Sequence, residues 1–339
     1  MIIEGDELLM NPSSMRGAVS RSRAWGMTAV MNPSVADIKR YKSQYDATDE
    51  VNGVQKQVIM DLWREGLMRP GISLWTIGTT QDEGLISAIR AGFEDVELWA
   101  DPLNYLLDSL DDILKSVRDQ EVSVWSVHAP FTGVDISSPD AIIRSKSLDM
   151  MKVTLEIASK VEAHYVVVHP SEKAYDDKKM YREAVRSLIR SLEELVKQAE
   201  RYGVRLVLEN MLSKPGKFRI GTSIKELKSL IEENGLDVGI CLDTGHSHHN
   251  GLRVDEEVIE ANGLLRTLHV NDNHGTMDEH LVPGEGTIDW NRFISSLSRV
   301  DDLEVLLLEV NTMNSEEILK RAYQAGMSLC RRIMSMKSS

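Results

Sequence analysis

The chain alternates short apolar runs with longer amphipathic stretches eight times, and no other feature of the sequence restricts the fold as much. The runs are rich in Val, Ile and Leu and nearly continuous, which is typical of strands buried on both faces. They cover residues 72–77, 95–99, 122–127, 165–168, 205–208, 238–242, 264–270 and 305–310. Helical patterns lie between them, at 80–92, 103–118, 139–162, 175–202, 222–234, 254–262, 290–299 and 315–336.

Eight strand–helix units that end in a helix predict an α/β fold of the (β/α)8 TIM-barrel type over residues 71–339. A doubly wound open sheet would also alternate, but the turn Ile77-Gly78-Thr79 lacks the G-x-G-x-x-G spacing that such a sheet usually carries. Residues 1–70 do not follow the alternation. Weak helical patterns at 35–44 and 53–66 predict an N-terminal, partly helical extension that packs on the barrel or mediates association into a homo-oligomer.

The charge is concentrated in the predicted barrel. The whole chain has 39 Lys and Arg against 53 Asp and Glu, a formal net charge of −14. Residues 1–70 hold nine acidic and nine basic side chains, so the entire −14 lies on residues 71–339. A body of that sign repels polyanions unless a local patch or a bound metal reverses the field. The charge therefore argues against a nucleic-acid partner.

Nothing in the sequence predicts a membrane or secreted location. The apolar runs are much shorter than a bilayer-spanning helix, and the N-terminus MIIEGDELLM is acidic and lacks the basic start of a secretory signal. Two cysteines, Cys241 and Cys330, provide no disulfide framework. We therefore expect a cytoplasmic protein.

Six consecutive predicted strands end in a protonatable side chain directly after the apolar run. In a (β/α)8 barrel these strand ends lie on one face, the face that holds the active site. The sixth strand is followed three residues later by a further protonatable side chain, His246, and the loop after the seventh strand adds two more. The complete set is His128, His169, Glu209, Asp243, His246, His269, Asp278, His280 and Glu309.

The composition of this set predicts a metal site. A single histidine at a strand end is more often structural, but five of the nine histidines of the chain belong to the set. Nine ionisable groups that converge without a cation would be costly to desolvate. Imidazole and carboxylate ligands without thiolate suit Zn²⁺, Mn²⁺, Fe²⁺ or Co²⁺, and nine ligands are enough for two or three ions.

The same segments resemble a known superfamily. The matching segments are SVHAPF, VVVHPSE, VLEN, CLDTGH, LHVNDNHGTMDEHLVPGEGTIDW and LLLEV, and they come from six strands. From about residue 71 to 336 the chain resembles the xylose isomerase-like TIM-barrel superfamily. Within it, the sugar phosphate isomerase/epimerase group and the endonuclease IV-type AP endonucleases are the most similar.

The resemblance implies two overlapping ligand sets. In endonuclease IV-type enzymes nine ligands hold three zinc ions, and the matching residues here are the nine above, with Glu209 as the bridging carboxylate. In the single-metal sugar epimerases the ligands are two Glu, one Asp and one His, which match Glu209, Asp243, His269 and Glu309 here. We therefore expect one to three divalent ions, Zn²⁺ or Mn²⁺, and the ligand set alone does not choose between the two chemistries.

We favour a metal-dependent sugar or sugar-phosphate isomerase or epimerase that works through a metal-stabilised enediolate. Glu209 and Glu309 are then the catalytic residues that move protons. Glu97, Lys214, Lys217 and Arg219 are the expected substrate contacts. The alternative is an endonuclease IV-like phosphodiester hydrolase, which the nine ligands suit and the negative charge disfavours. A third interpretation is a metal-binding barrel without catalysis.

Overall fold

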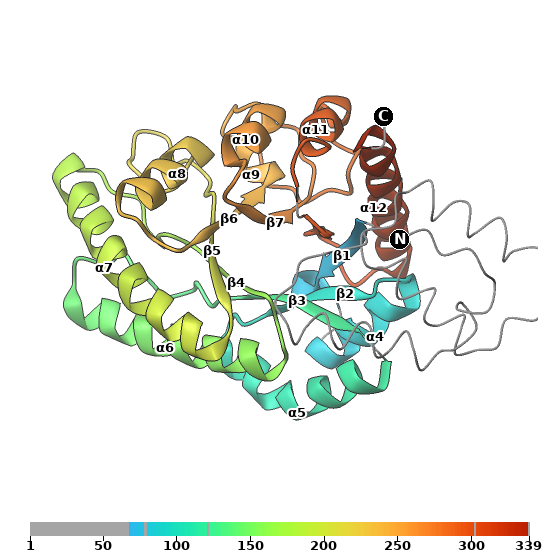
Figure 1. The fold of residues 1–339 in the computed structure, drawn as a ribbon, viewed down its shortest axis with the longest axis horizontal. Coiled ribbons are helices and arrows are strands. Elements are labelled where there is room, and N and C mark those ends of the chain that lie inside the picture. The colour runs from blue at the N-terminus through green and yellow to red at the C-terminus, as the bar shows by residue number, and fades with distance from the viewer. Residues whose placement is uncertain (1–67, 78–79, 121, 302, 338–339) are drawn as a thin grey trace, which may run out of the picture. The chain divides into compact units, whose positions relative to one another are not determined.

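The computed structural model describes residues 68–77, 80–120, 122–301 and 303–337, and it contains eight parallel strands with helices between them (Figure 1). The strands are β1 Arg69–Ser73, β2 Asp95–Trp99, β3 Ser123–His128, β4 Tyr165–Val168, β5 Arg205–Glu209, β6 Gly239–Asp243, β7 Leu265–His269 and β8 Val305–Leu308. Each strand is followed by at least one helix before the next begins. The predicted (β/α)8 fold is confirmed.

The sheet closes into a barrel at the seam between β7 and β8. The strand order is β7-β6-β5-β4-β3-β2-β1-β8, and β1 pairs in parallel with both β2 and β8. At the seam, Val270 and Leu308 form a single parallel bridge. Val270 N donates to Leu307 O at 2.8 Å, and Glu309 N donates to Val270 O at 3.1 Å. The barrel is thus nearly closed, with its weakest pairing just beyond the end of β7.

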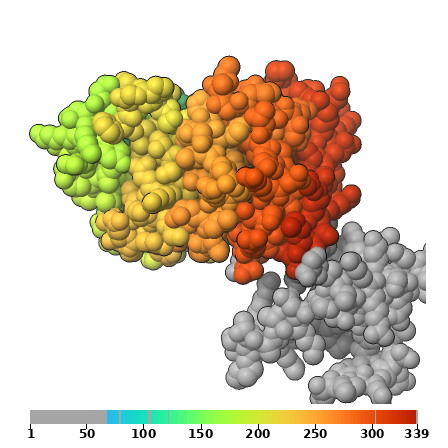
Figure 2. All heavy atoms as spheres, turned by 90° about the horizontal axis from the view of Figure 1, so that it is seen from above, coloured from blue at the N-terminus to red at the C-terminus, as the bar shows by residue number. Residues whose placement is uncertain are grey.

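The helices that follow the strands form the outer layer. They are α4 Gln81–Ala91, α5 Leu103–Gln120, α6 Ala141–Lys160, α7 Lys178–Tyr202, α8 Ile224–Glu233, α9 Thr244–His249, α10 Val254–Ala261, α11 Trp290–Leu297 and α12 Glu316–Lys337. Figure 2 shows one face of this layer, on which the elements follow one another in chain order from green to red. Among the described residues, no helix combines the length and the apolar character that a membrane crossing needs.

Two elements differ from the sequence-based expectation. The first strand lies at Arg69–Ser73, three residues before the predicted run begins, and Leu74–Thr76 forms a 3-10 turn, η2. The run continues past the strand because Leu74 and Ile77 are buried in the turn region. His248 and His249 belong to the short helix α9, which the sequence pattern did not predict. The helices expected at 35–44 and 53–66 lie outside the described residues.

Two apolar clusters pack against the two sides of the sheet. The large one lies between the strands and the surrounding helices and includes Leu85, Leu188 and Phe293. The small one lies inside the barrel and consists of Trp125, Tyr165, Val167, Val207, Cys241, Val305 and Leu307. These residues belong to the beginnings and middles of their strands, so the interior is filled there and the strand ends are left for polar side chains.

The large cluster predicts a clear difference between two aliphatic truncations. Leu188 on α7 is 0% exposed, whereas Ile142 on α6 is 69% exposed. We expect Leu188→Ala to lower the free energy of unfolding by ~2–5 kcal/mol through lost packing and a residual cavity. Ile142→Ala should change it by less than ~0.5 kcal/mol. Urea unfolding followed by circular dichroism measures both, and equal losses would contradict the assignment of the core.

Candidate metal centre and active site

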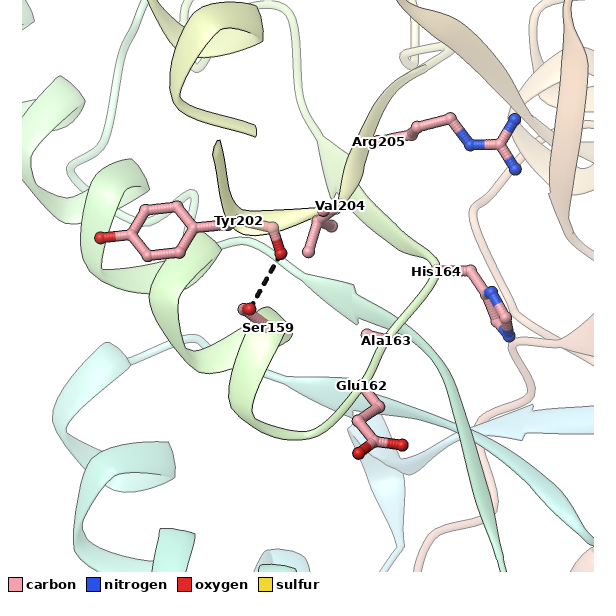
Figure 3. Close-up of a pocket in the computed structure, with 8 residues that line it drawn as sticks. Ser159, Glu162, Ala163, His164, Tyr202, Val204 and Arg205 are labelled. Atoms are coloured by element: carbon pink, nitrogen blue, oxygen red, sulfur yellow. Dashed lines mark hydrogen bonds between the residues drawn. The ribbon is translucent and has the colours of Figure 1, made fainter. Parts of the chain in front are cut away.

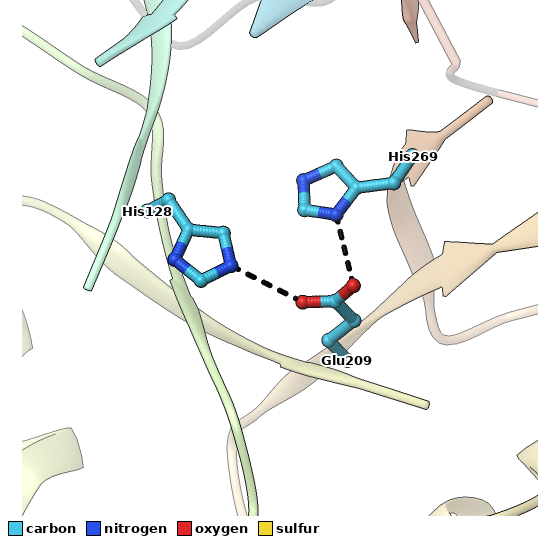
Figure 4. Close-up of side chains that lie close together, drawn as sticks. All are labelled: His128, Glu209 and His269. Atoms are coloured by element: carbon cyan, nitrogen blue, oxygen red, sulfur yellow. Dashed lines mark hydrogen bonds and ion pairs between the residues drawn. The ribbon is translucent and has the colours of Figure 1, made fainter. Parts of the chain in front are cut away.

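Glu209, at the end of β5, is the centre of the polar cluster. Its carboxylate is 1% exposed and has imidazoles on both oxygens. Oε2 lies 3.3 Å from His128 Nε2 and 3.1 Å from His169 Nε2. Oε1 lies 3.0 Å from His269 Nδ1 and 3.5 Å from His246 Nδ1. Figure 4 shows Glu209 between His128 and His269, which reach it from two other strands.

A second carboxylate shares His269 with Glu209. Glu309 Oε2 lies 3.1 Å from His269 Nδ1, the same nitrogen that faces Glu209 Oε1. Together with Asp243 these residues form a fully buried group of four whose potential ligand atoms all lie within 4.8 Å of one another. Its four residues lie at the ends of β5, β6 and β7 and directly after β8.

A further group of potential ligands comes from α9 and the loop after β7. Asp278 Oδ2 lies 3.5 Å from His246 Nε2 and 3.2 Å from His280 Nε2. Asp278 is 25% exposed, and the two imidazoles are 9% exposed. His280 has a φ of +49°, and its Nδ1 lies 2.9 Å from Glu309 O, which ties this group to the end of β8. The structure therefore brings all nine predicted ligands together.

Two asparagines fix the backbone and carboxylate of Asp243. Asn210 Oδ1 accepts from Asp243 N at 2.7 Å, and Asn210 Nδ2 donates to Asp243 O at 3.0 Å. Asn271 Nδ2 donates to Asp243 Oδ2 at 3.0 Å. A Cβ at Gly245 would lie 1.9 Å from Asn271 Oδ1, so only glycine leaves room for this amide. Asp243 is thus held in place through both its main chain and its side chain.

Asp272 organises the loop that carries Asp278 and His280, and no sequence pattern distinguished it from its neighbours. Its carboxylate is 0% exposed and accepts four hydrogen bonds. The donors and distances are Asn273 N 2.9 Å, Ile288 N 3.2 Å, Gly284 N 2.8 Å and Trp290 Nε1 2.8 Å. The two ends of the loop are also paired, because Asp272 and Leu281 exchange backbone hydrogen bonds at 2.9 and 2.8 Å.

Glu97, expected as a substrate contact, contacts His269 at the ring nitrogen opposite to the one that faces Glu209. Its carboxylate is 0% exposed, and its Oε2 lies 3.2 Å from His269 Nε2 and accepts from Ser126 Oγ at 2.8 Å. This contact favours a proton on His269 Nε2, which leaves Nδ1 free to face Glu209 and Glu309. The location is that of a positioning residue for His269, and the substrate contact stays a prediction.

The three basic residues expected to contact substrate are in different environments. Lys214 and Lys217 are exposed, and Lys217 Nζ lies 3.2 Å from Asp176 Oδ1. Arg219 is partly buried and donates to Leu212 O at 3.2 Å and to Ser171 O at 3.5 Å. Of the three, Arg219 alone is packed between the loops after β4 and β5.

Aromatic rings cover the histidines on the β1–β3 side of the site. The ring centroid of Trp75 lies 4.6 Å from that of His280, and the centroid of Trp99 lies 4.4 Å from that of His128. Phe131 lies 4.7 Å from His169. These contacts limit the access of water and therefore strengthen electrostatic interactions within the cluster.

The pKa values of the cluster follow from the balance between burial and charge. Burial alone would lower the pKa of His246, but Asp243, Asp278 and Glu209 raise that pKa to about 10. Burial would likewise lower the pKa of His280, which Asp278 and Glu309 raise to about 9. Burial raises the pKa of Asp243 to about 7. Burial would also raise the pKa of Glu309, but His269 lowers it to about 2. Without a cation, protons on the imidazoles offset the charge of the carboxylates.

These residues fit a divalent cation. The ligand set is imidazole and carboxylate, the set that Zn²⁺ and Mn²⁺ accept. Asp278 Oδ1 and Glu97 Oε1 are buried and have no hydrogen-bond partner among the described residues. A cation bound here would replace the protons on the imidazoles, because a ligating histidine must be neutral.

A separate cavity of 290 Å³ lies at the opposite end of the barrel (Figure 3). Its lining includes His164 and Arg205, which lie at the N-terminal ends of β4 and β5. Ser159 Oγ donates to Tyr202 O at 2.9 Å within this cavity. The cavity shares no residue with the nine predicted ligands, so it is not part of the same site.

A comparison with known protein families shows to which family the chain belongs. Residues 86–333 match the family model described as xylose isomerase-like TIM barrel. The chain belongs to this family. The resemblance seen in the sequence is thereby confirmed, and the cluster lies at the strand ends of a xylose isomerase-like barrel.

Proteins similar in sequence to this xylose isomerase-like barrel include an uncharacterized protein and a probable endonuclease. An uncharacterized protein of Methanocaldococcus jannaschii is 33% identical over 194 residues, which are 57% of this chain and 74% of that protein. A probable endonuclease 4 of Aquifex aeolicus is 29% identical over 184 residues, which are 49% of this chain and 63% of that protein. The chain thus matches less than two thirds of the length of that endonuclease.

Solved structures with the same fold include sugar epimerases. A D-tagatose 3-epimerase-like protein superposes with a TM-score of 0.68 at 22% identity, covering 80% of this chain and 98% of that one. The IOLI protein, whose structure has a bound zinc atom, superposes with a TM-score of 0.66 at 23% identity, covering 79% and 100% of the two chains. At these identities the likeness establishes the fold.

The hydrogen bonds of Asp272 predict a strong effect of a nearly isosteric change. In Asp272→Asn an amide NH₂ replaces one carboxylate oxygen and can no longer accept from the N–H donors that face it. Since buried donors lose their acceptor, we expect the free energy of unfolding to fall by ~2 kcal/mol or more. Metal content, measured by mass spectrometry, should fall because the loop with Asp278 and His280 loosens. The exposed Asp237→Asn is the control; an unchanged Asp272→Asn would contradict this role.

The raised pKa values predict how the stability of the metal-free protein depends on pH. The pKa values of His246 and His280 are about 10 and about 9 in the folded state, against 6.5 as the ordinary value. The folded state therefore binds these protons more tightly, and their stabilisation is complete below pH 6.5 and lost as the pH rises through 9 and 10. The raised pKa of Asp243 acts in the same direction.

We therefore expect the thermal unfolding midpoint of chelator-treated protein to fall between pH 6.5 and pH 9, in scans of full-length protein. With Zn²⁺ or Mn²⁺ added, the midpoint should be higher, and the difference should grow with pH because metal competes with fewer protons. A metal-independent midpoint would argue against the metal centre.

Proposed function

We propose that this barrel is a divalent-metal-dependent isomerase or epimerase of a small sugar or sugar phosphate. The observation that carries the proposal is the pair of buried carboxylates, Glu209 and Glu309, which lie 3.0 and 3.1 Å from the same nitrogen of His269. A reaction that moves a proton between adjacent carbons, or between two faces of one carbon, needs a base and an acid at a common centre.

The chain can hold and move the protons of such a reaction. A divalent cation bound by Glu209, Asp243, His269 and Glu309 supplies Lewis-acid polarisation of a carbonyl and its neighbouring hydroxyl. Glu209 takes the proton from the carbon that bears this hydroxyl, and an enediolate forms. Glu309 returns a proton at the neighbouring carbon in an isomerisation, or at the opposite face in an epimerisation. Both side chains have lowered pKa values and so start as ionised carboxylates. Glu309 therefore takes a proton from solvent before it donates one, and Glu209 releases the proton that it has taken to solvent at the end of the turnover.

The charge of residues 71–339 supports a small substrate rather than duplex DNA. Lys217 is paired with Asp176, and Arg253 is paired with Asp255 and Glu256. The whole net charge of −14 lies on residues 71–339. Binding to duplex DNA depends on several basic side chains free to contact successive phosphates. The similarity in fold to sugar epimerases agrees with the same choice.

Phosphoester hydrolysis is the second candidate, and the group of His246, Asp278 and His280 favours it. These three residues add ligands beyond the four that proton transfer at one cation needs. A cluster of ions can activate water and stabilise both the attacking and the leaving oxygen of a phosphate ester. The similarity to probable endonuclease 4 proteins also supports this candidate.

Solvent deuterium incorporation separates the two candidates. Metal-loaded protein is incubated in D₂O with a panel of ketoses and ketose phosphates, and exchange is followed by NMR. We expect Glu209→Gln and Glu309→Gln each to lower exchange by about 10²–10⁴, the usual contribution of a general acid or base. The exposed Glu233→Gln is the matched control and should retain exchange. Cleavage of an abasic-site duplex at low protein concentration, with no exchange on any sugar, would replace the first candidate by the second.

A further inference from the structure

Arg219 is a partly buried cation with unused hydrogen-bonding capacity. Its guanidinium donates to two backbone carbonyl oxygens, Leu212 O at 3.2 Å and Ser171 O at 3.5 Å. Nε is buried and has no hydrogen-bond partner among the described residues. A guanidinium has five N–H donors, so this side chain uses two of them and leaves the rest for another acceptor.

Ser171, whose carbonyl oxygen accepts from this guanidinium, carries a second unpartnered donor. The serine is 0% exposed, and its Oγ is buried without a hydrogen-bond partner among the described residues. Buried polar groups without partners are uncommon in folded proteins, and they need a reason such as a ligand. Ser171 follows His169 by two residues, and His169 Nε2 lies 3.1 Å from Glu209 Oε2. Burial lowers the pKa of Arg219 and the charge of Glu209 raises it, so the guanidinium lies within reach of the central carboxylate of the candidate active site.

The backbone on both sides of Arg219 is held by hydrogen bonds. Phe218 and Tyr175 exchange backbone hydrogen bonds at 2.7 and 2.8 Å, which join the loops after β5 and β4. On the other side, Met211 N donates to Gly221 O at 2.7 Å. Gly221 has a φ of +82°, and a Cβ there would lie 2.8 Å from Pro170 Cγ. The donors are therefore preorganised, which lowers the entropy cost of binding a ligand.

We propose that Arg219 and Ser171 bind the phosphate of a phosphorylated sugar at the β4–β5 edge of the active site. The shared chemistry is that of an oxyanion, and a phosphate fits better than a carboxylate because guanidinium and hydroxyl together offer at least three donors. This assignment rests on the proposed function and narrows its substrate to sugar phosphates. The exposed lysines Lys214 and Lys217 are not required for it.

Titration calorimetry with inorganic phosphate tests the binding site without turnover. The full chain is titrated both metal-loaded and after chelation. We expect Arg219→Met to weaken phosphate binding at least tenfold in both states, whereas Lys225→Met, which removes an exposed charge from α8, leaves it unchanged. Equal phosphate affinity in wild type and Arg219→Met would overturn the proposal. Acetate that binds as tightly as phosphate would overturn the choice of phosphate.

Two further variants separate ligand binding from structure. Because Ser171 Oγ has no partner, Ser171→Ala should keep the thermal midpoint of the phosphate-free protein and weaken phosphate binding several-fold. Arg219→Lys retains the charge but not the planar fork, and it should also bind phosphate less tightly than wild type. This variant supplies the test if Arg219→Met does not fold. An Arg219→Lys or Ser171→Ala protein with wild-type phosphate affinity would overturn the assignment.

The outcomes also distinguish this site from the proposed function. Phosphate binding that depends on Arg219, with no deuterium exchange on any sugar, would refute the isomerase or epimerase and leave the phosphate site. Exchange that proceeds with the same KM for phosphorylated and unphosphorylated ketoses, in both wild type and Arg219→Met, would refute the phosphate site and leave the reaction.

Discussion

The electrostatic balance around Glu209 is the constraint on which the rest of this barrel depends. A carboxylate that is 1% exposed has lost almost all of its hydration, and four imidazoles within 3.5 Å compensate for that loss. Each imidazole comes from a different strand end or from the helix after it. The barrel can therefore bring these groups together only if its strands keep their register. Inside the barrel, the apolar layer at the strand beginnings and middles and the ionisable layer at the strand ends stabilise one another.

The positions of the nine candidate ligands were predictable because strand ends are visible in sequence. A run such as 205–208 marks a buried strand, and the residue that follows it must reach the same face as the residues after the other runs. The environment of each side chain was not predictable in this way. Glu97 was expected from the sequence as a substrate contact, and its neighbours in space, Ser126 and His269, are distant in sequence and could not be read from the pattern.

The elements that sequence reasoning missed are those defined by hydrogen bonds rather than by hydrophobic pattern. Asp272 is one of several polar residues after β7, and its role depends on four donors in a loop that closes on itself. The short helix α9 begins where Asp243 Oδ1 accepts from His246 N, so the same carboxylate belongs to the ligand cluster and caps a helix. Arg219 was one of the substrate contacts expected from the sequence, whereas Ser171 was distinguishable only once the hydrogen-bond partners of its hydroxyl could be counted.

The division of the ligands between strands and a loop has a consequence for how such a barrel can change. Glu209, Asp243, His269 and Glu309 belong to the ends of β5–β8 and are bound to the framework. Asp278 and His280 lie in a segment anchored at Asp272, and exchanging that segment would leave every strand intact. A descendant could thus lose or regain the potential ligands Asp278 and His280 by altering one loop, while the two carboxylates proposed to transfer protons are inherited unchanged with the strands.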